Sequence, residues 1–255
     1  METFIITKIK DNTKEVIDDL VAEEVTFTLN IGDKELVTLL CMPCDLEDLV
    51  RGFLFTSGLI KKADEIKNIV LNKQQWVAYI ELVNGVECED LLFKRLYTSG
   101  CGSGTLFYNA LDIMHRLKIT SDFKIRSEHA IALMTDFQKR SQIYFKTGGV
   151  HSAALADEKG ILIFREDIGR HNAIDKVIGH AVLLNNTFEN KILLTSGRIS
   201  SEVLFKVKKC GVPIVISRSA PTNQGIRLSK DFGITLVGFA RGNRMNVYSG
   251  EERII

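Results

Sequence analysis

One cysteine of the chain stands in a segment of glycine and hydroxyl side chains, from Thr98 to Thr105. The small neighbours of Cys101 leave room for a second molecule to reach its sulfur. An apolar stretch from Leu106 to Leu117 follows and is typical of a helix, whose N-terminus would favour the thiolate over the thiol. The segment predicts a reactive thiol, and a glycine-rich turn with an incidental cysteine is the alternative.

Three other segments carry groups suited to a phosphate-bearing ligand. Residues 196–202 and 217–222 each follow a strand-like run and precede a helix-like run, and each supplies serines, backbone N–H donors and one arginine. Residues 239–244 leave the last strand-like run with two arginines, an amide and an aromatic ring, which together suit a nucleotide. For either of the first two segments alone, helix capping with a solvated arginine explains the residues equally well. The candidate ligand residues are Ser196, Arg198, Ser217, Phe239, Ala240, Arg241, Gly242, Asn243 and Arg244.

A histidine and a dense group of charges lie between these segments. His151 follows a Gly-Gly turn and can carry a proton or donate to an anion, although a lone histidine often has only a structural role. Arg170 begins a helix-like stretch, shortly after the carboxylates Glu166 and Asp167. We expect His151 and Arg170 to contribute to the site and the two carboxylates to brace the basic groups.

The composition is that of an ordinary globular protein. Of 255 residues 45% are hydrophobic, and 33 Lys and Arg against 32 Asp and Glu give a net charge of +1. That balance provides no global field for nucleic acid or an anionic membrane, so any anion site must be local. The sequence has no signal-peptide pattern and no run of about 18 apolar residues. With five scattered cysteines, these features predict a cytoplasmic protein without nucleic-acid or membrane partners.

The first hundred residues predict a small α+β unit, and the remainder predicts alternating strands and helices. The expected elements of the first part are strands at 24–30 and 35–40, a helix at 45–55, and strands at 76–83 and 86–93 that meet at an Asn84-Gly85 turn. Those of the second part are strands at 160–164, 191–195, 213–217 and 235–239, and helices at 171–184, 200–210 and 223–232.

Loops that follow the strands of such an α/β unit lie at the carboxyl edge of its sheet, where ligands usually bind. The chain contains neither a GxGxxG motif nor a P-loop lysine, so dinucleotide redox chemistry and NTP hydrolysis lose their main support. We predict two domains, residues 1–100 and 101–255.

Several ordered motifs resemble those of the formate dehydrogenase accessory family, FdhD/NarQ, and they cover nearly the whole chain. They are the helix with Arg51-Gly52-Phe53-Leu54, the Cys101-Gly102 loop, and residues 147–154, 166–176, 196–200, 210–213 and 236–241. The resemblance implies a sulfurtransferase that takes sulfane sulfur from a cysteine desulfurase and holds it as a persulfide on Cys101. The acceptor would be a molybdenum or tungsten bis(guanine dinucleotide) pterin cofactor, Mo-bis(molybdopterin guanine dinucleotide) in the molybdenum form, which formate dehydrogenase needs.

The resemblance also implies a fold and an assembly. The expected fold is a cytidine deaminase-like α/β domain preceded by a smaller α+β domain, and members are expected to form homodimers. The zinc signature of the deaminases is absent from the second half of the chain, so no zinc is expected.

The chain departs from the family at one position, because Gly104 stands where a second loop cysteine is common. Cys101 must then both accept and donate sulfur, or another thiol must help. Cys41-Met42-Pro43-Cys44 has CxxC spacing but no second ligand pair, and Cys88 and Cys210 suit packed thiols.

Two functions from different classes fit these observations. The first is a sulfurtransferase in which Cys101 carries the persulfide and His151 or Arg170 positions the sulfur or the cofactor. The second is a chaperone that carries the molybdenum cofactor without covalent sulfur chemistry. A plain guanine-nucleotide binder is a weaker third possibility, and GDP binding alone would not support it.

Overall fold

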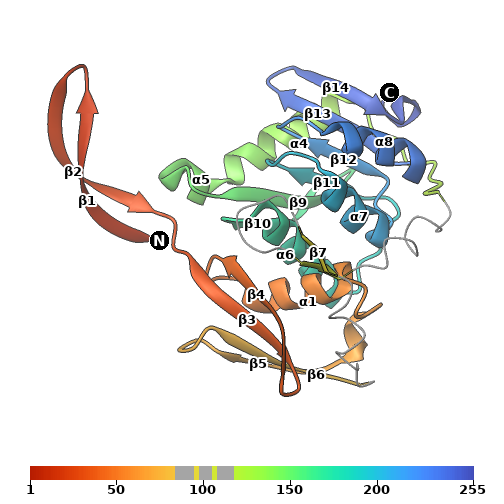
Figure 1. Cartoon of the computed structure of the whole chain (residues 1–255). Coiled ribbons are helices and arrows are strands. Elements are labelled where there is room, and N and C mark those ends of the chain that lie inside the picture. The colour runs from red at the N-terminus through yellow and green to blue at the C-terminus, as the bar shows by residue number, and fades with distance from the viewer. Residues whose placement is uncertain (84–94, 98–104, 108–117) are drawn as a thin grey trace.

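The computed structural model describes residues 1–83, 95–97, 105–107 and 118–255 of the chain. Two β-sheets dominate it, one of four strands in the N-terminal part and one of six strands in the C-terminal part. Helices α1 (Leu46–Thr56) and α6 (Arg170–Leu183) lie against each other between the sheets (Figure 1). This arrangement confirms the predicted fold class, an α/β unit preceded by a smaller α+β unit.

The smaller sheet has the strand order β4-β3-β6-β5 and packs one face on α1. Its strands are β3 (Val25–Ile31), β4 (Lys34–Cys41), β5 (Ile66–Asn72) and β6 (Val77–Leu82). β3 and β4 form the predicted hairpin, whose turn holds Gly32 at a φ of 58°. Alternate residues of β3, Phe27 and Leu29, share a buried core with Leu49 of the helix. The period-two pattern of the sequence therefore reports the buried face of this sheet.

The strand predicted at 76–83 is confirmed as β6. β3 pairs with β6 in parallel and β5 pairs with it antiparallel. The predicted hairpin partner, residues 86–93 after the Asn84-Gly85 turn, lies outside the described residues. The sequence did not predict β5, because Lys67 and Asn68 interrupt its apolar pattern.

The larger sheet has the strand order β10-β9-β11-β12-β13-β14. Its strands are β9 (His151–Asp157), β10 (Gly160–Asp167), β11 (Ile192–Thr195), β12 (Ile214–Ser217), β13 (Thr235–Arg241) and β14 (Arg244–Ser249). β11, β12 and β13 are parallel to one another, and the other neighbours pair antiparallel. The four strands predicted in this part of the chain are confirmed, and β9 and β14 extend the sheet beyond the prediction.

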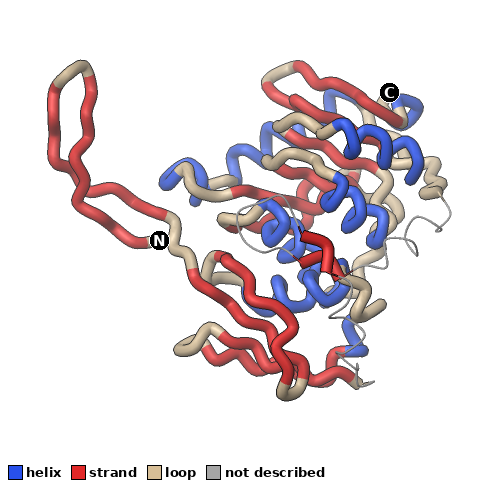
Figure 2. The backbone as a smooth tube through the Cα atoms, viewed as in Figure 1, coloured by secondary structure: helices blue, strands red, loops and turns tan. Residues whose placement is uncertain are grey.

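Helices cover both faces of the larger sheet (Figures 1 and 2). Besides α1 and α6, the helices of the described residues are α4 (Ser127–Arg140), α5 (Gln142–Thr147), α7 (Ser201–Cys210), α8 (Asn223–Phe232) and the short 3₁₀ helices η1 (Ala63–Glu65) and η2 (Glu251–Arg253). Leu193 and Val215 share one core with α6 and α7, whereas Leu194 and Ile216 share another with α4. These buried strands therefore carry apolar residues on both faces, which explains their continuous apolar runs.

The seam between α1 and α6 joins the two sheets. A Cβ atom on Gly52 would collide with the carbonyl oxygen of Asp175, and one on Gly179 would collide with that of Asp48. The backbones of the two helices therefore touch, and only glycine fits at these two positions. The predicted domain boundary near residue 100 falls in a segment outside the described residues.

An N-terminal hairpin stands apart from both sheets (Figure 1). Its strands β1 (Glu2–Lys10) and β2 (Thr13–Val21) pair along their whole length. Asp11 and Asn12 form its two-residue turn with φ values of 48° and 62°, a conformation that Asp and Asn tolerate. The sequence did not predict this hairpin.

A second pair of strands flanks the segment that contains Cys101. β7 (Arg95–Tyr97) pairs antiparallel with β8 (Thr105–Phe107), and Tyr97 lies opposite Thr105. The predicted helix from Leu106 is therefore wrong at its start, because residues 105–107 pair as a strand. Its remainder, residues 108–117, lies outside the described residues.

Candidate functional site

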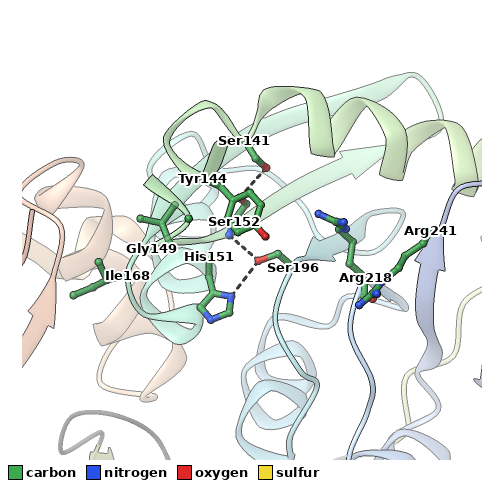
Figure 3. Close-up of a pocket in the computed structure, with 11 residues that line it drawn as sticks. Ser141, Tyr144, Gly149, His151, Ser152, Ile168, Ser196, Arg218 and Arg241 are labelled. Atoms are coloured by element: carbon green, nitrogen blue, oxygen red, sulfur yellow. Dashed lines mark hydrogen bonds between the residues drawn. The ribbon is translucent and has the colours of Figure 1, made fainter. Parts of the chain in front are cut away.

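A pocket of about 430 Å³ opens at the carboxyl ends of β11, β12 and β13 (Figure 3). This is the edge at which α/β sheets usually bind ligands. The pocket is lined by Ser141, Tyr144, Gly148, Gly149, Val150, His151, Ser152, Ile168, Ser196, Arg218 and Arg241. Among these described lining residues none is acidic. The structure thus brings together three of the predicted site residues, His151, Ser196 and Arg241.

A hydrogen-bonded chain positions His151 on one side of the pocket. The Ser196 hydroxyl lies 3.2 Å from Nδ1 of His151 and accepts the backbone N–H of Ser152 at 2.9 Å. Burial, followed by the charges of Arg170 and Arg198, lowers the pKa of His151 below its usual 6.5. A neutral ring can accept the Ser196 hydroxyl proton at Nδ1 and carry its own proton on Nε2. His151 then offers an N–H donor without a fixed positive charge.

Two arginines lie on the opposite side of the pocket from His151, as Figure 3 shows. Arg241 donates from Nε to the backbone carbonyl of Arg218 at 2.8 Å, which fixes its guanidinium beside that loop. The Nε of Arg218 is buried and has no hydrogen-bond partner among the described residues. Within the same residues neither guanidinium takes part in an ion pair. The terminal nitrogens of two adjacent cations are therefore available to an anion.

Arg218 was not a candidate site residue in the sequence analysis. It belongs to a segment predicted to bind phosphate, but the sequence gives no reason to prefer Ser217 or Arg218 within it. The structure does distinguish them. Ser217 is fully buried, donates to the carbonyl of Gly197 at 2.7 Å and accepts the N–H of Ser219 at 2.9 Å. Ser217 therefore braces two loops, while the next residue lines the pocket.

Arg170 and Arg198 lie near the pocket without lining it. Arg170 begins α6 and packs on Gly197, where a Cβ atom would approach the Cβ of Arg170 to 2.9 Å. Arg198 is exposed on the same loop. Because both charges lower the pKa of His151, they add to the positive potential at this end of the pocket.

The segment 239–244 is not a loop after the last strand, as predicted, but the end of β13 and the turn into β14. Arg241 lies opposite Arg244, and Gly242 and Asn243 form the turn between them, with Gly242 at a φ of 58°. Ala240 is buried in the core under α4. Of the six predicted residues in this segment, only Arg241 lines the pocket.

Phe239 of this segment has an unusual backbone conformation. Its φ is 53°, a region that bulky residues rarely adopt, and its N–H donates to the carbonyl of Ser219 at 3.1 Å. The register of β13 and β14 is also irregular between Gly238 and Arg241. This irregularity lies immediately before Arg241, where bulges often redirect a side chain next to a site.

The chain is similar to known proteins over most of its length. The profile of the FdhD/NarQ family matches residues 22–255. The chain belongs to this family. Two proteins named sulfur carrier protein FdhD, from Bacillus pumilus and Bacillus subtilis, are 42% and 41% identical to it. The matches cover 92% and 93% of this chain, and 90% and 91% of those proteins.

A solved structure extends the likeness to three dimensions. The crystal structure of a protein from Desulfotalea psychrophila, described as a formate dehydrogenase accessory protein, superposes with a TM-score of 0.81. The two sequences are 26% identical, and the match covers 100% of this chain and 99% of that chain. The whole described architecture is therefore similar to that of a solved protein.

The carboxylates of the FdhD/NarQ motif at residues 166–176 hold elements together. Glu166 accepts the N–H groups of Ile143 and Tyr144, at 3.1 and 3.0 Å, and so positions α5 at the pocket wall. Asp167 is fully buried, pairs with Lys176 at 2.7 Å and accepts the N–H of Met42 at 3.1 Å. It therefore links the smaller sheet to the start of α6.

Asp175 of the same motif lies in the α1–α6 seam. It accepts two hydrogen bonds of 2.7 Å from Lys206 on α7 and one of 2.8 Å from the Thr56 hydroxyl on α1. All three side chains are buried. This cluster joins three helices and lies apart from the pocket lining.

The described thiols are not activated. Burial raises the pKa of Cys41 to about 12 and also raises the pKa values of Cys44 and Cys210. Lys176 lies 3.8 Å from the sulfur of Cys44, but its charge only partly opposes the effect of burial. Cys88 and the predicted carrier Cys101 lie outside the described residues.

Within residues 1–83, 95–97, 105–107 and 118–255, no group of three His, Cys, Asp or Glu side chains is arranged to hold a metal ion. No helix in those ranges is both long enough and apolar enough to cross a membrane.

Proposed function

We propose that this FdhD/NarQ protein is a sulfur carrier for a molybdenum or tungsten bis(guanine dinucleotide) pterin cofactor. It accepts sulfane sulfur from a cysteine desulfurase on Cys101 and passes it to the cofactor, which formate dehydrogenase then uses. Relatives named sulfur carrier protein, and a structural neighbour described as a formate dehydrogenase accessory protein, support this proposal. The observation that carries it is the pair of arginines, free of carboxylate partners among the described residues, facing His151 across a pocket.

The loading step needs only thiolate chemistry. The Cys101 thiolate attacks the terminal sulfur of the desulfurase persulfide, a new S–S bond forms, and the desulfurase cysteine leaves as a thiolate. When the sulfane atom is passed on, this S–S bond breaks and Cys101 returns to the thiolate. The two electrons that convert sulfane sulfur into sulfide come from the acceptor.

The pocket suits one nucleotide part of such a cofactor. A volume of about 430 Å³ is typical of a site for one small ligand, and it is lined by donors without a carboxylate among the described residues. We assign the phosphates to Arg218 and Arg241, because guanidinium groups bind phosphate through paired hydrogen bonds. The ring of Tyr144, 41% exposed at the pocket wall, can stack on the base. His151 and Ser196 supply further hydrogen bonds.

The remaining parts of the proposal concern partners and location. We propose a cytoplasmic protein that forms a homodimer and contacts both the cysteine desulfurase and formate dehydrogenase. The cytidine deaminase-like character of the larger domain also stays a prediction.

A non-covalent cofactor chaperone is the second candidate, and one feature of the chain favours it. Gly104 replaces the second loop cysteine that is common in the family, which removes a resolving thiol. The pocket, by contrast, is lined by the donors His151, Ser196, Arg218 and Arg241. Under this alternative, Cys101→Ala leaves formate dehydrogenase maturation nearly intact, whereas Arg218→Ala or Arg241→Ala damages it.

Peptide mass spectrometry tests the proposed function. The reduced protein is incubated with a cysteine desulfurase and cysteine, and the peptides are examined for added sulfur. We expect one sulfur, removable by reductant, on the Cys101 peptide and none in Cys101→Ala, with Cys210→Ala as the matched control that still loads. No loading, or loading only at Cys41 or Cys44, would contradict the proposal and favour the chaperone.

A further inference from the structure

The N-terminal hairpin is exposed on both of its faces. Among residues 1–21 only Ile6 and Ile17 are half-buried, and all others are exposed. Figure 1 shows β1 and β2 extending away from both sheets. A two-stranded hairpin without a covering surface is at best marginally stable in water. The hairpin therefore needs a surface that covers it.

One face of the hairpin carries a continuous apolar stripe. The register pairs Leu20 with Thr3, Ile5 with Asp18, Val16 with Thr7, and Ile9 with Lys14, and paired residues share a face. On this face Ile5 is 78% exposed, Val16 70%, Ile9 65% and Leu20 38%. Exposed apolar groups that adjoin in this way mark an interaction surface more often than isolated ones do.

The charges on the same face have opposite signs at its two ends. Lys14 lies two residues from Val16 toward the turn, and Asp18 lies two residues from Val16 toward the base. A second copy rotated by 180° about an axis through Val16, across the strands, would therefore face Asp18 with Lys14 and Ile5 with Ile9. Val16 would face Val16. In this pairing the apolar residues Ile5, Ile9 and Val16 each meet an apolar residue, and Lys14 and Asp18 each meet the opposite charge.

We propose that this stripe is a contact between two copies of the chain, whose hairpins pack face to face and antiparallel about Val16. The inference rests on the homodimer in the proposed function and names the segment that forms it. A self-complementary patch of this kind is what a two-fold dimer requires. A second copy is also always present with the first, so it can cover the hairpin permanently.

The arrangement has a consequence for the pocket. The turn of each hairpin would lie near the base of the other. There β2 contacts α5, and the Cβ of Ala22 lies 3.3 Å from the Cβ position of Gly149, a pocket residue. Dimerisation would therefore bring a second copy to the edge of the α5 wall, beside Tyr144.

Size-exclusion chromatography with light scattering on the full chain tests the inference. We expect a dimer for the wild type and a monomer for Val16→Asp. Lys14→Glu and Asp18→Lys should each weaken dimerisation at least about tenfold, and the double variant should restore it, because each new charge again meets its opposite. Asp19→Lys, on the opposite face next to Phe4, is the matched control and should remain dimeric.

The outcomes separate the two proposals. A monomeric wild type would overturn both the homodimer and the hairpin contact. A dimeric wild type with a dimeric Val16→Asp variant would overturn the hairpin contact alone, and a double variant no more dimeric than the single ones would overturn the proposed register. Circular dichroism of each variant verifies that the two sheets remain folded.

Discussion

The α1–α6 seam and the pocket use charged residues in opposite ways. In the seam Asp175 and Lys206, and nearby Asp167 and Lys176, are buried and satisfy each other. At the pocket Arg218 and Arg241 converge without a carboxylate in the described part of the chain. Burying unpaired charge is costly, so paired charges indicate structure, whereas accessible cations without partners indicate a ligand. The charged residues of the segment 165–176 mostly belong to the first kind.

Breaking the buried pair should have the largest effect on stability. Lys206→Ala leaves Asp175 buried without its cation, which should lower the free energy of unfolding by about 3–5 kcal/mol. Chemical denaturation monitored by circular dichroism measures this. Lys67→Ala is the control, because Lys67 pairs with Glu81 at 2.6 Å on the surface and should cost less than about 1 kcal/mol. Equal losses in the two variants would contradict the distinction.

The close approach of the two helices predicts the next largest effect. Gly179→Ala places a Cβ against the backbone carbonyl of Asp48, so the helices must separate, at a cost of about 1–3 kcal/mol. Thermal and urea unfolding of this variant measure the loss. Gly197→Ala is not a matched control for this backbone contact, because its new Cβ would meet the side chain of Arg170 and not a backbone carbonyl. An unchanged midpoint for Gly179→Ala would show that the seam is looser than its geometry indicates.

The stability of the protein should fall on acidification, in part because of His151. Burial lowers the pKa of His151 in the folded protein below 6.5, its value in the unfolded chain. At a pH between the two pKa values, the unfolded chain therefore binds a proton that the folded chain does not. The free energy of unfolding contributed by His151 is therefore present above pH 6.5 and is lost as the pH falls below it. The free energy of unfolding of His151→Gln should fall less than that of the wild type between pH 7 and about pH 5, as measured by urea unfolding at a series of pH values. Parallel curves for the two proteins would count against the lowered pKa.

The smallest effect on stability is expected at the pocket itself. Arg218→Ala and Arg241→Ala remove no ion pair within the described residues, and Arg241→Ala removes only one exposed hydrogen bond, to the carbonyl of Arg218. Each variant should therefore change the free energy of unfolding by less than about 1 kcal/mol. Urea unfolding in the absence of ligand tests this. A loss as large as that of Lys206→Ala would mean that the arginines are structural.

Much of the α/β core was predictable because its strands are buried on both faces. The runs Ile192–Thr195 and Ile214–Ser217 each consist of three apolar residues followed by one hydroxyl residue, and helix signals separate them. The edge elements were not predictable in the same way. β14, with Arg244, Asn246 and other exposed residues, lacks a clean alternation, and both faces of the N-terminal hairpin mix apolar and charged residues.

The site was predictable as a set of loops but not residue by residue. The ends of parallel strands meet at one edge of the sheet, which brought Ser196 and Arg241 together. His151 lies at the same edge because it begins β9, which runs antiparallel to β11. Which side chain of a loop turns into the pocket depends on local hydrogen bonds. Ser217 turns inward to Gly197 and leaves the pocket to Arg218, and the sequence alone contains no sign of that choice.

Isothermal titration calorimetry with GDP, the nucleotide part of the proposed cofactor, tests the central claim most directly. The wild type should bind GDP, Arg218→Ala and Arg241→Ala should each weaken binding about tenfold or more, and exposed Arg227→Ala on α8 should leave it unchanged. Guanosine, which lacks phosphates, should bind the wild type and both arginine variants with similar affinity. GDP binding to the Arg218→Ala/Arg241→Ala double variant with wild-type affinity would contradict the assignment of this pocket to the cofactor.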